Sequence, residues 1–430
     1  MPSVAVLVEL MRSATSGGHV KCWERFAESA AGLPDDSGLD LTVYFLGERE
    51  RVERLSPHVR LVMLRPLIGT ARLTSARGAE DVTDLAPYHP GLAALLPGHD
   101  VWHLTHAFAY ASTAVRAARR TPRRVRLVAS VHTDVPALAA VYGRYAAGSW
   151  PRPAREALAA GAERALARRR YRLLSACERV LAPTPAAREE LARALGPDRV
   201  LPLRRGVDRH RFHPDDPDGA ARSALVRRHG VPPDRPLILF AGRLDATKGL
   251  PLLADSVRLL RARGSPAHLV LAGSGAEAGR VRRALGSDVT LLGPLPQEGL
   301  AHVYAGCDVF AFPSRTETCG NVVAEAMASG LAVVLPEGAH TTQWLTAPGE
   351  DGVVVRHDTP VAWADALGAL ITDPPRLAAL RSRSATTART SHPTWDRVLR
   401  EDLLPVWAAS SGDVPARAAT PAGRSGGAGG

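Results

Sequence analysis

The sequence predicts an α/β protein of two domains, each built on a doubly wound and mostly parallel sheet. Short apolar runs alternate with segments of helical periodicity, and this alternation is typical of βαβ units. It stops in a Pro- and Asp-rich passage at residues 211–219, which we interpret as a linker, and resumes at Pro236. With 430 residues, the chain is long enough for each domain to have its own core.

The first block, residues 1–205, begins with an apolar run that predicts a buried strand directly at the N-terminus. The strands expected in this block are Val4–Glu9, Leu41–Leu46, Val59–Leu64, Val101–Leu104, Val125–Val131 and Val180–Pro183. The helices expected here are Val20–Ala31, Ala111–Arg119, Arg155–Ser175 and Ala186–Leu195. Ligands of such sheets gather at the carboxyl ends of the strands, where the connecting loops are therefore candidate site loops.

The second block, residues 206–390, repeats the pattern after the linker. Its expected strands are Leu237–Ala241, His268–Ala272, Val289–Leu292, Asp308–Phe312, Leu331–Leu335 and Gly352–Val355. Its expected helices are Gly249–Arg263, Ala276–Leu285, Pro296–Tyr304, Val322–Ala328, Pro360–Ile371 and Pro375–Thr387. A last helix is expected at Trp395–Ala409, within a segment spanning residues 391–409. The tail at residues 410–430 is rich in Ala, Pro, Gly and Ser, which predicts disorder.

The N-terminus and the cysteines indicate a cytoplasmic protein. Residues 1–10 lack a basic start and reach Glu9 too early for a signal peptide, and no apolar run is long enough to span a bilayer. The four cysteines form no CxxC pair and no cluster with zinc spacing. We therefore expect buried free thiols, namely Cys22, Cys177, Cys307 and Cys319.

The net charge of +11 is carried almost wholly by arginine, since Lys21 and Lys248 are the only lysines. No basic motif with interleaved aromatic residues occurs, so we expect no nucleic-acid partner. The densest arginine clusters, at residues 164–172 and 119–126, would suit an anionic membrane surface, although solvated helix faces explain them equally well. Each lysine stands beside a glycine turn, where a compact charge on a flexible stem suits a phosphate.

One stretch, Ser314–Gly330, carries the strongest chemical signal. It follows a buried strand, and Gly320 stands where a helix is expected to begin. The free N–H groups of that helix start would form an anion site suited to a phosphate. Glu317 and Glu325 bracket the site with seven residues between them, so both carboxylates could point to the carboxyl edge of the sheet. The alternative is an ordinary β-loop-α unit with two solvated glutamates.

Carboxylates on both sides of a phosphate site suit a ligand with hydroxyl groups flanking its phosphates, as in a nucleotide sugar. A second strand-to-helix loop supports this interpretation, because Arg243 and Lys248 place two cations where a diphosphate would lie. Such cations can stabilise the charge of a leaving diphosphate without a metal ion. The pair Asp216 and Asp218 resembles a metal-binding DxD, but its flanking prolines favour a solvated turn, so we expect no metal.

The stretch resembles the signature of retaining glycosyltransferases of family 4. The matching residues are Pro313, Ser314, Glu317, Gly320, Glu325, Ala326, Met327, Ala328 and Gly330. Cys319 departs from the pattern, where an aromatic or other bulky residue is usual, and we expect a packing variation. The resemblance implies the GT-B fold: two facing Rossmann-like domains, an acceptor-binding one first and a donor-binding one second, with a nucleotide-sugar cleft between them. It also implies that the last helix crosses back onto the first domain.

The resemblance also assigns roles to residues. The catalytic group would be His132, Arg243, Lys248 and Glu317. The donor-binding group would be Gly17, Gly18, Arg243, Lys248, Gly273, Gly275, Cys319, Gly320, Asn321 and Glu325. His132 would lie near the donor sugar, although a satisfied structural histidine remains an alternative, and the turn at residues 205–208 matches the family's interdomain hinge. The loop at residues 336–342 departs from the glycine-rich loop of many relatives, which leaves the sugar open.

The expected activity is retaining transfer of a hexosyl unit from a UDP- or GDP-sugar to a hydroxyl acceptor, which could be a lipid, a glycan or a small natural product. No cofactor or metal is implied, and the leaving diphosphate would take the acceptor proton. A sugar-phosphate synthase of the same fold and a non-catalytic scaffold that binds nucleotide sugars are the alternatives.

Overall fold

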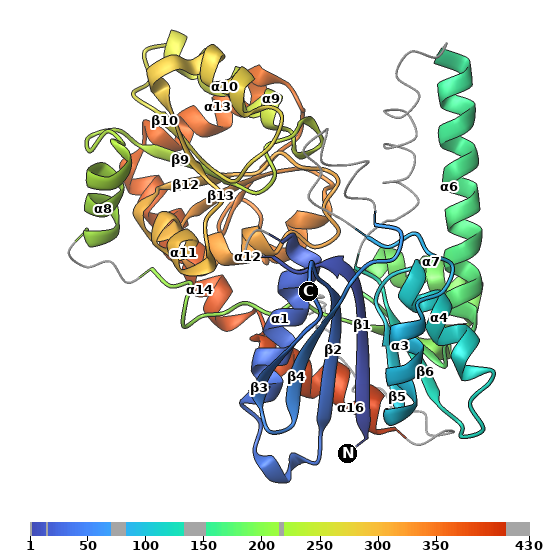
Figure 1. Ribbon diagram of the computed structural model, residues 1–430. Helices are drawn as coiled ribbons and strands as arrows, with labels where there is room; N and C mark the ends of the chain where they lie inside the picture. Colours follow the sequence, from blue (N-terminus) through green and yellow to red (C-terminus); the bar gives the residue numbers. More distant parts are fainter. Residues whose placement is uncertain (1, 14–15, 70–82, 133–151, 215–218, 410–430) are drawn as a thin grey trace, which may run out of the picture.

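The computed structural model describes residues 2–13, 16–69, 83–132, 152–214 and 219–409. The chain forms two α/β units that lie side by side, each around its own mainly parallel sheet (Figure 1). The predicted α/β class with two parallel-sheet domains is confirmed. The predicted DxD pair, Asp216 and Asp218, and the tail at residues 410–430 lie outside the described residues.

The first sheet has eight strands in the order β3-β4-β2-β1-β5-β6-β7-β8. Only the pairing of β3 with β4 is antiparallel. The strands are β1 (Ser3–Met11), β2 (Asp40–Leu46), β3 (Arg51–Ser56), β4 (Val59–Leu64), β5 (Val101–Leu104), β6 (Arg126–Ser130), β7 (Arg179–Ala182) and β8 (Val200–Pro202). Alternate residues of β1 belong to separate apolar clusters, with Val4 and Val6 in one and Ala5 and Leu7 in the other. Both faces of the sheet are therefore buried, which explains the continuous apolar runs.

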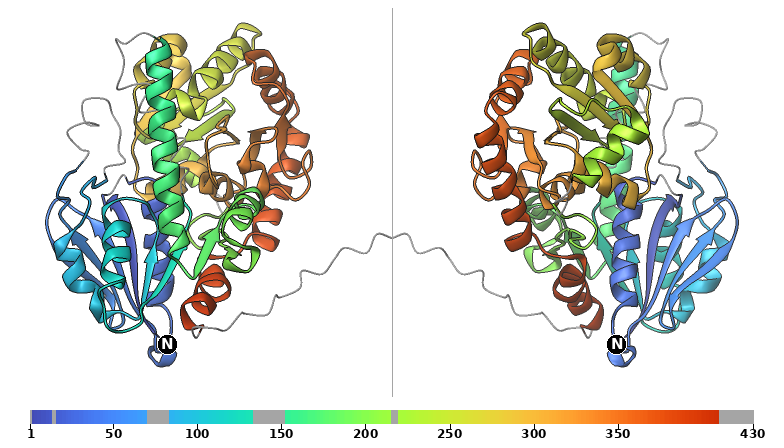
Figure 2. Two further views of the ribbon diagram at one scale, coloured as in Figure 1. Left: turned by 90° about the vertical axis from the view of Figure 1, so that its right-hand side faces the viewer. Right: turned by 90° about the vertical axis from the view of Figure 1, so that its left-hand side faces the viewer.

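Helices cover both faces of the first sheet. The main ones are α1 (Gly18–Ala31), α3 (Pro90–Leu95), α4 (Ala109–Ala118), α6 (Arg152–Ser175) and α7 (Pro185–Leu195). Two views at right angles to Figure 1 show α6 as a long helix that rises beyond the sheet of this unit (Figure 2). Among the described residues, no helix is both long and apolar enough to cross a membrane.

The second sheet has six parallel strands in the order β11-β10-β9-β12-β13-β14. They are β9 (Leu237–Ala241), β10 (His268–Ala272), β11 (Val289–Gly293), β12 (Val309–Ala311), β13 (Ala332–Pro336) and β14 (Val353–Val355). The helices are α8 (Ala220–His229), α9 (Leu250–Ala262), α10 (Ala278–Leu285), α11 (Gln297–Gly306), α12 (Asn321–Ala328), α13 (Pro360–Ile371) and α14 (Pro374–Thr390). Their apolar faces join the strands in one large core.

The last described segment, residues 391–409, returns to the first unit (Figure 1), where Trp395 and Trp407 join the apolar cluster of β1 and α1. Arg126 donates to the carbonyl oxygens of Val406 and Trp407 at 3.1 and 3.0 Å. Trp407 Nε1 in turn donates to His103 Nδ1 at 3.0 Å. The C-terminal segment is thus part of the first core rather than an appendage.

The helix expected at residues 395–409 is confirmed over Trp395–Ala408, and it contains a π-helical stretch that was not predicted. It runs without a gap through α15 (Trp395–Val398), the π-helical stretch Leu399–Leu403 and α16 (Leu404–Ala408). Pro405 explains the π-helical stretch, because it lacks an N–H and its ring displaces the carbonyl four residues earlier. Strands β3 and β8 and helices α3 and α8 were not predicted. Strand β3 is a largely exposed polar edge strand, β8 has three residues, α3 has six, and α8 buries only Ala221 and Leu225.

Candidate active site

The predicted site loops lie where each sheet changes winding direction. In the second sheet β9 lies between β10 and β12, so the loops that leave β9 and β12 diverge at its carboxyl edge. In the first sheet the corresponding point lies between β1 and β5. Such switch points are where open α/β sheets bind ligands. The loop after β9 carries Arg243 and Lys248, and the loop after β12 carries Glu317 and Gly320.

Lys248 and Glu317 form an ion pair across these two loops, with Nζ and Oε1 2.6 Å apart. Both side chains are mostly buried, at 12% and 26% exposed. Asp245 shapes the first loop by accepting from the backbone N–H of Lys248 at 3.1 Å. Gly249 has a φ of 74°, and a Cβ there would lie 2.7 Å from the Pro313 carbonyl oxygen, so the loops pack backbone to backbone. The paired charges are consequently held by the fold.

The predicted helix start at Gly320 is confirmed. Gly320 is the N-cap residue of α12 with a φ of 63°, and a Cβ there would lie 2.5 Å from Thr341 Cγ2. Among the described residues no side chain caps this helix, so the N–H groups of Asn321 and Val322 remain available to an anion, whereas that of Val323 donates to the Gly320 carbonyl oxygen. The side-chain oxygen of Asn321 is buried without a partner among the described residues, which leaves an unused acceptor at the same place. Trp344 Nε1 fixes the turn by donating to the Cys319 carbonyl at 2.7 Å.

Glu325 lies one turn further along α12, in a largely buried position. Burial raises the pKa of its carboxyl group to about 7, while the positive charge of Arg25 opposes the shift. The Tyr304 hydroxyl contacts the same carboxyl group, and Arg211 is also close enough to influence it. Glu317 and Glu325 are therefore in different environments, since only Glu317 has a lysine counter-ion.

The glycine turn after β10 has a packing role. A Cβ on Gly273 would lie 1.9 Å from the Gly242 carbonyl oxygen, and one on Gly275 would lie 2.4 Å from the Leu244 carbonyl oxygen. Both glycines have positive φ, at 140° and 156°. They allow the turn to pack against the loop that carries Arg243. In that loop, Arg243 Nε lies 3.5 Å from Asp245 Oδ2. The predicted role toward a nucleotide base remains a prediction.

In the first unit, Gly17 and Gly18 stand at the beginning of α1, where none of the described side chains caps the helix. Lys21 was interpreted as a phosphate-binding residue, but its Nζ lies 2.9 Å from Glu24 Oε2 on the same helix. Glu24 also accepts from Arg12 Nε at 2.7 Å. The charge of Lys21 is therefore already balanced within the first unit.

His132 lies at the carboxyl end of β6, and protein groups engage both of its ring nitrogens. Nδ1 lies 2.8 Å from an Arg205 nitrogen, and Nε2 lies 2.6 Å from Ser130 Oγ. Burial, together with the charge of Arg205, lowers the pKa of His132 well below its usual range. A hydrogen bond from a ring nitrogen to a ligand would require exchange of one of these partners. The neighbouring Thr133 and Asp134 lie outside the described residues.

Sequence reasoning missed two groups of residues here. His19 stacks between His132 and His106, with ring centroids 4.3 and 5.7 Å away. Arg205, noted only as part of a hinge, reaches His132 and also contacts Cys22 Sγ at 2.8 Å and the side chain of Cys319. The signal that could have identified Arg205 was its position in the turn between the domains, where one residue can reach both.

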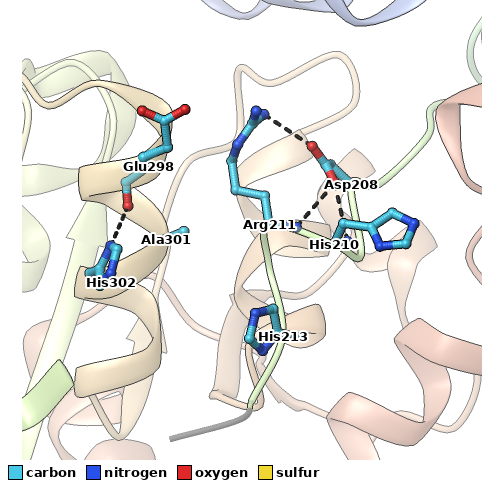
Figure 3. Close-up of a pocket in the computed structure, with 7 residues that line it drawn as sticks. All are labelled: Asp208, His210, Arg211, His213, Glu298, Ala301 and His302. Carbon is cyan, nitrogen blue, oxygen red and sulfur yellow. Dashed lines mark hydrogen bonds and ion pairs between the residues drawn. The ribbon is translucent and has the colours of Figure 1, made fainter. Parts of the chain in front are cut away.

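A separate hollow of about 380 Å³ lies between the linker and α11 (Figure 3). On one side, Asp208 and Arg211 form an ion pair with 3.0 Å between oxygen and nitrogen. On the α11 side, His302 Nδ1 lies within hydrogen-bonding distance of the Glu298 carbonyl oxygen. None of the predicted site residues lines it. Within the described ranges, no group of three or more His, Cys, Asp or Glu side chains is arranged to hold a metal ion.

Comparisons with known proteins match both units of the chain to family models. The family model described as Glycosyltransferase Family 4 matches residues 25–211, and the model described as Glycosyl transferases group 1 matches residues 235–373. The chain is 34% identical to a D-inositol 3-phosphate glycosyltransferase of Xylanimonas cellulosilytica, over 57% of this chain and 60% of that protein. It is 33% identical to a GDP-mannose-dependent alpha-mannosyltransferase of Mycolicibacterium smegmatis, over 77% of this chain and 79% of that protein. The match therefore spans about three fifths of the first relative.

Solved structures share the fold at low sequence identity. Sucrose-phosphate synthase of Thermosynechococcus elongatus aligns with a TM-score of 0.65 and 20% identity, covering 93% of this chain and 96% of that one. HepE of Anabaena, solved in complex with UDP-glucose, aligns with a TM-score of 0.68 and 16% identity, covering 93% and 98%. These neighbours establish the expected GT-B arrangement of two facing Rossmann-like domains.

Proposed function

Because this chain belongs to glycosyltransferase family 4, we propose that it transfers a hexosyl unit from a nucleoside-diphosphate sugar to a hydroxyl group of an acceptor. The observation that carries the proposal is the Lys248–Glu317 pair beside the uncapped start of α12, at the switch point of the second sheet. A cation, a carboxylate and free N–H groups at one place match a diphosphate that bears a sugar.

Donor binding would distribute these groups along the nucleotide sugar. Arg243, Lys248 and the first N–H groups of α12 would hold the diphosphate. Glu317 would accept from hydroxyl groups of the hexose, and Glu325 from those of the ribose. The partnerless side-chain oxygen of Asn321 supplies one further acceptor beside the helix start. The glycine turn at residues 273–275 would lie along the base.

We propose that transfer retains the anomeric configuration and proceeds by attack on the face from which the diphosphate leaves. The bond from the anomeric carbon to the phosphate oxygen breaks, and a bond from that carbon to the acceptor oxygen forms. The acceptor proton passes to the departing phosphate oxygen, so no protein base is needed. Arg243 and Lys248 would stabilise the growing charge on the diphosphate in place of a metal ion.

The relatives suggest which substrates to test first. One is named for D-inositol 3-phosphate and another for dependence on GDP-mannose. We therefore propose a UDP- or GDP-linked hexose as the donor and a hydroxyl-bearing acceptor, with D-inositol 3-phosphate as the first candidate.

Contact with an anionic membrane at the cytoplasmic face is a further part of the proposal. The exposed residues Arg164, Arg168 and Arg172 follow one another at four-residue intervals, so they share one side of α6. The arginine cluster at residues 119–126 is less available to a membrane, since Arg123 pairs with Asp100 and Arg126 with Glu178. Co-sedimentation with vesicles of anionic and of neutral lipid tests this contact, and equal binding to both would contradict it.

The main test is thermal unfolding in the presence of UDP, GDP, ADP or TDP, with and without EDTA. Stabilisation should rise with the concentration of the correct nucleotide above its Kd and should be unchanged by EDTA. Product NMR with the donor identified in this way then reports the anomeric configuration. An inverted product would contradict retention, and preference for a sugar phosphate as acceptor would indicate a synthase. Nucleotide binding without turnover of any donor would indicate a non-catalytic scaffold.

A further inference from the structure

The guanidinium group of Arg205 is buried, and in the described part of the chain it has no carboxylate partner. The residue is 7% exposed, and no Asp or Glu among the described residues pairs with it. Its contacts are neutral: the thiol of Cys22 at 2.8 Å, Nδ1 of His132 at 2.8 Å, and the side chain of Cys319. A buried charge without a counter-ion is unfavourable, and folded proteins normally pair such a group or bind an ion there.

Arg205 lies where the two units meet. Cys22 belongs to α1, and His132 follows β6 at the carboxyl edge of the first sheet. Cys319 immediately precedes Gly320, which begins α12 in the second unit. The guanidinium group therefore contacts α1 and the loop after β6 in the first unit, and Cys319 beside the start of α12 in the second.

The predicted phosphate-binding cations are in a different situation. Lys248 lies 2.6 Å from Glu317, and Arg243 lies 3.5 Å from Asp245. Each of these charges has a carboxylate neighbour, whereas the charge of Arg205 has none among the described residues. A substrate phosphate arriving at this place would supply the counter-ion that Arg205 lacks.

We propose that Arg205 binds a phosphate group of a substrate at the junction of the two units, as a positively charged residue additional to Arg243 and Lys248. This inference rests on the proposed function, because it assumes a phosphate-bearing substrate. That phosphate is either part of the donor diphosphate or a phosphate carried by the acceptor. The planar guanidinium group suits either source, since it can donate two parallel hydrogen bonds to one phosphate.

The test compares Arg205→Met, which removes the charge, with Arg205→Lys, which keeps it. The matched control is Arg204→Met, because the adjacent Arg204 is already paired with Asp402 and Glu401. The probes are UDP and GDP against their monophosphates, inorganic pyrophosphate, and D-inositol 3-phosphate against free inositol. Kd values are measured by calorimetry, and thermal unfolding is recorded without ligand.

Arg205→Met should weaken the binding of a phosphate-bearing probe by about 10- to 100-fold in Kd, as expected for loss of a hydrogen bond to a charged group. Arg205→Lys should retain part of the affinity, and Arg204→Met should retain nearly all of it. A loss confined to UDP and GDP assigns the phosphate to the donor, and a loss confined to D-inositol 3-phosphate assigns it to the acceptor. Without ligand, Arg205→Met should be at least as stable as the wild type, because it removes an uncompensated buried charge.

Three results would overturn the inference. If Arg205→Met binds every phosphate probe as tightly as the wild type does, the phosphate lies elsewhere and the proposed function still stands. If Arg205→Met is less stable without ligand and its affinities are unchanged, the residue has only a structural role. Failure of the wild type itself to bind any nucleoside diphosphate would overturn the proposed function together with this inference.

Discussion

Lys248 Nζ lies 2.6 Å from Glu317 Oε1, so a cation and a carboxylate from two separate loops meet at the carboxyl edge of the second sheet. Each side chain holds the other in place before any ligand arrives. A diphosphate would draw Lys248 toward itself, and Glu317 would then be available to sugar hydroxyl groups. The pair therefore connects the two parts of the proposed donor.

Replacing Glu317 by Gln should abolish most transfer while nucleotide binding persists. The carboxylate would contact the hexose rather than the nucleotide, so we expect kcat to fall about 100-fold or more, as when one polar contact to a transition state is removed. Kinetics with the donor and calorimetry with the nucleoside diphosphate measure the two effects. Glu350→Gln is the matched control, because Glu350 is exposed and pairs only with Arg383 in the described part of the chain. A wild-type kcat in the E317Q variant would show that Glu317 takes no part in the transfer.

Gly206→Ala should destabilise the protein where the turn at residues 205–208 meets the C-terminal segment. A Cβ on Gly206 would lie 2.4 Å from the Trp395 backbone nitrogen, so this turn and α15 would have to move apart. We expect a loss of about 1 to 3 kcal/mol in the free energy of unfolding, measured with urea. Gly98→Ala is the control, since a Cβ there meets nothing within 4 Å. Equal losses in both variants would contradict the close contact.

Trp407→Ala should destabilise the first unit although Trp407 is far from it in sequence. The indole ring is fully buried in the cluster of β1 and α1, and its Nε1 donates to His103. Removing so large a buried side chain costs about 3 to 5 kcal/mol. Hydrogen exchange should show faster opening of β1 and α1, while β9 and β10 remain protected. Uniform loss of protection in both units would show instead that they unfold together.

Glu9 predicts a specific dependence of stability on pH. Its side chain is fully buried, and burial raises the pKa to about 8 although the N–H groups of Ala111 and Phe108 oppose the shift. The folded state therefore binds this proton more tightly than the unfolded state does. Stability should fall as the pH rises from about 4.5 to 8, by about 1.4 kcal/mol per pH unit relative to Glu9→Gln, and should then level off.

Urea unfolding of the wild type and Glu9→Gln at several pH values in this window measures that slope. Glu401→Gln is the control, because hydrogen bonds from Arg204 and Arg397 lower the pKa of Glu401, which places its titration below the window. Parallel curves for the wild type and Glu9→Gln would show that Glu9 does not hold its proton in the folded state.

The sequence by itself determined the alternating elements and the two site loops. Strands such as β5, β9 and β10 have the predicted bounds, because each is a short apolar run whose burial on both sheet faces leaves a local pattern. The helix start at Gly320 could also be predicted, since only a left-handed residue joins this loop to α12 and glycine adopts that conformation at little cost.

Only the tertiary structure decided which charges are balanced. Distances between side chains decide that Lys21 pairs with Glu24 and Lys248 with Glu317. They also decide that, within the described ranges, no carboxylate lies beside Arg205. Arg205 and Cys319 are 114 positions apart in the chain yet touch in the fold. Burial and Coulomb energies depend on position in space, and no local pattern of residues encodes them.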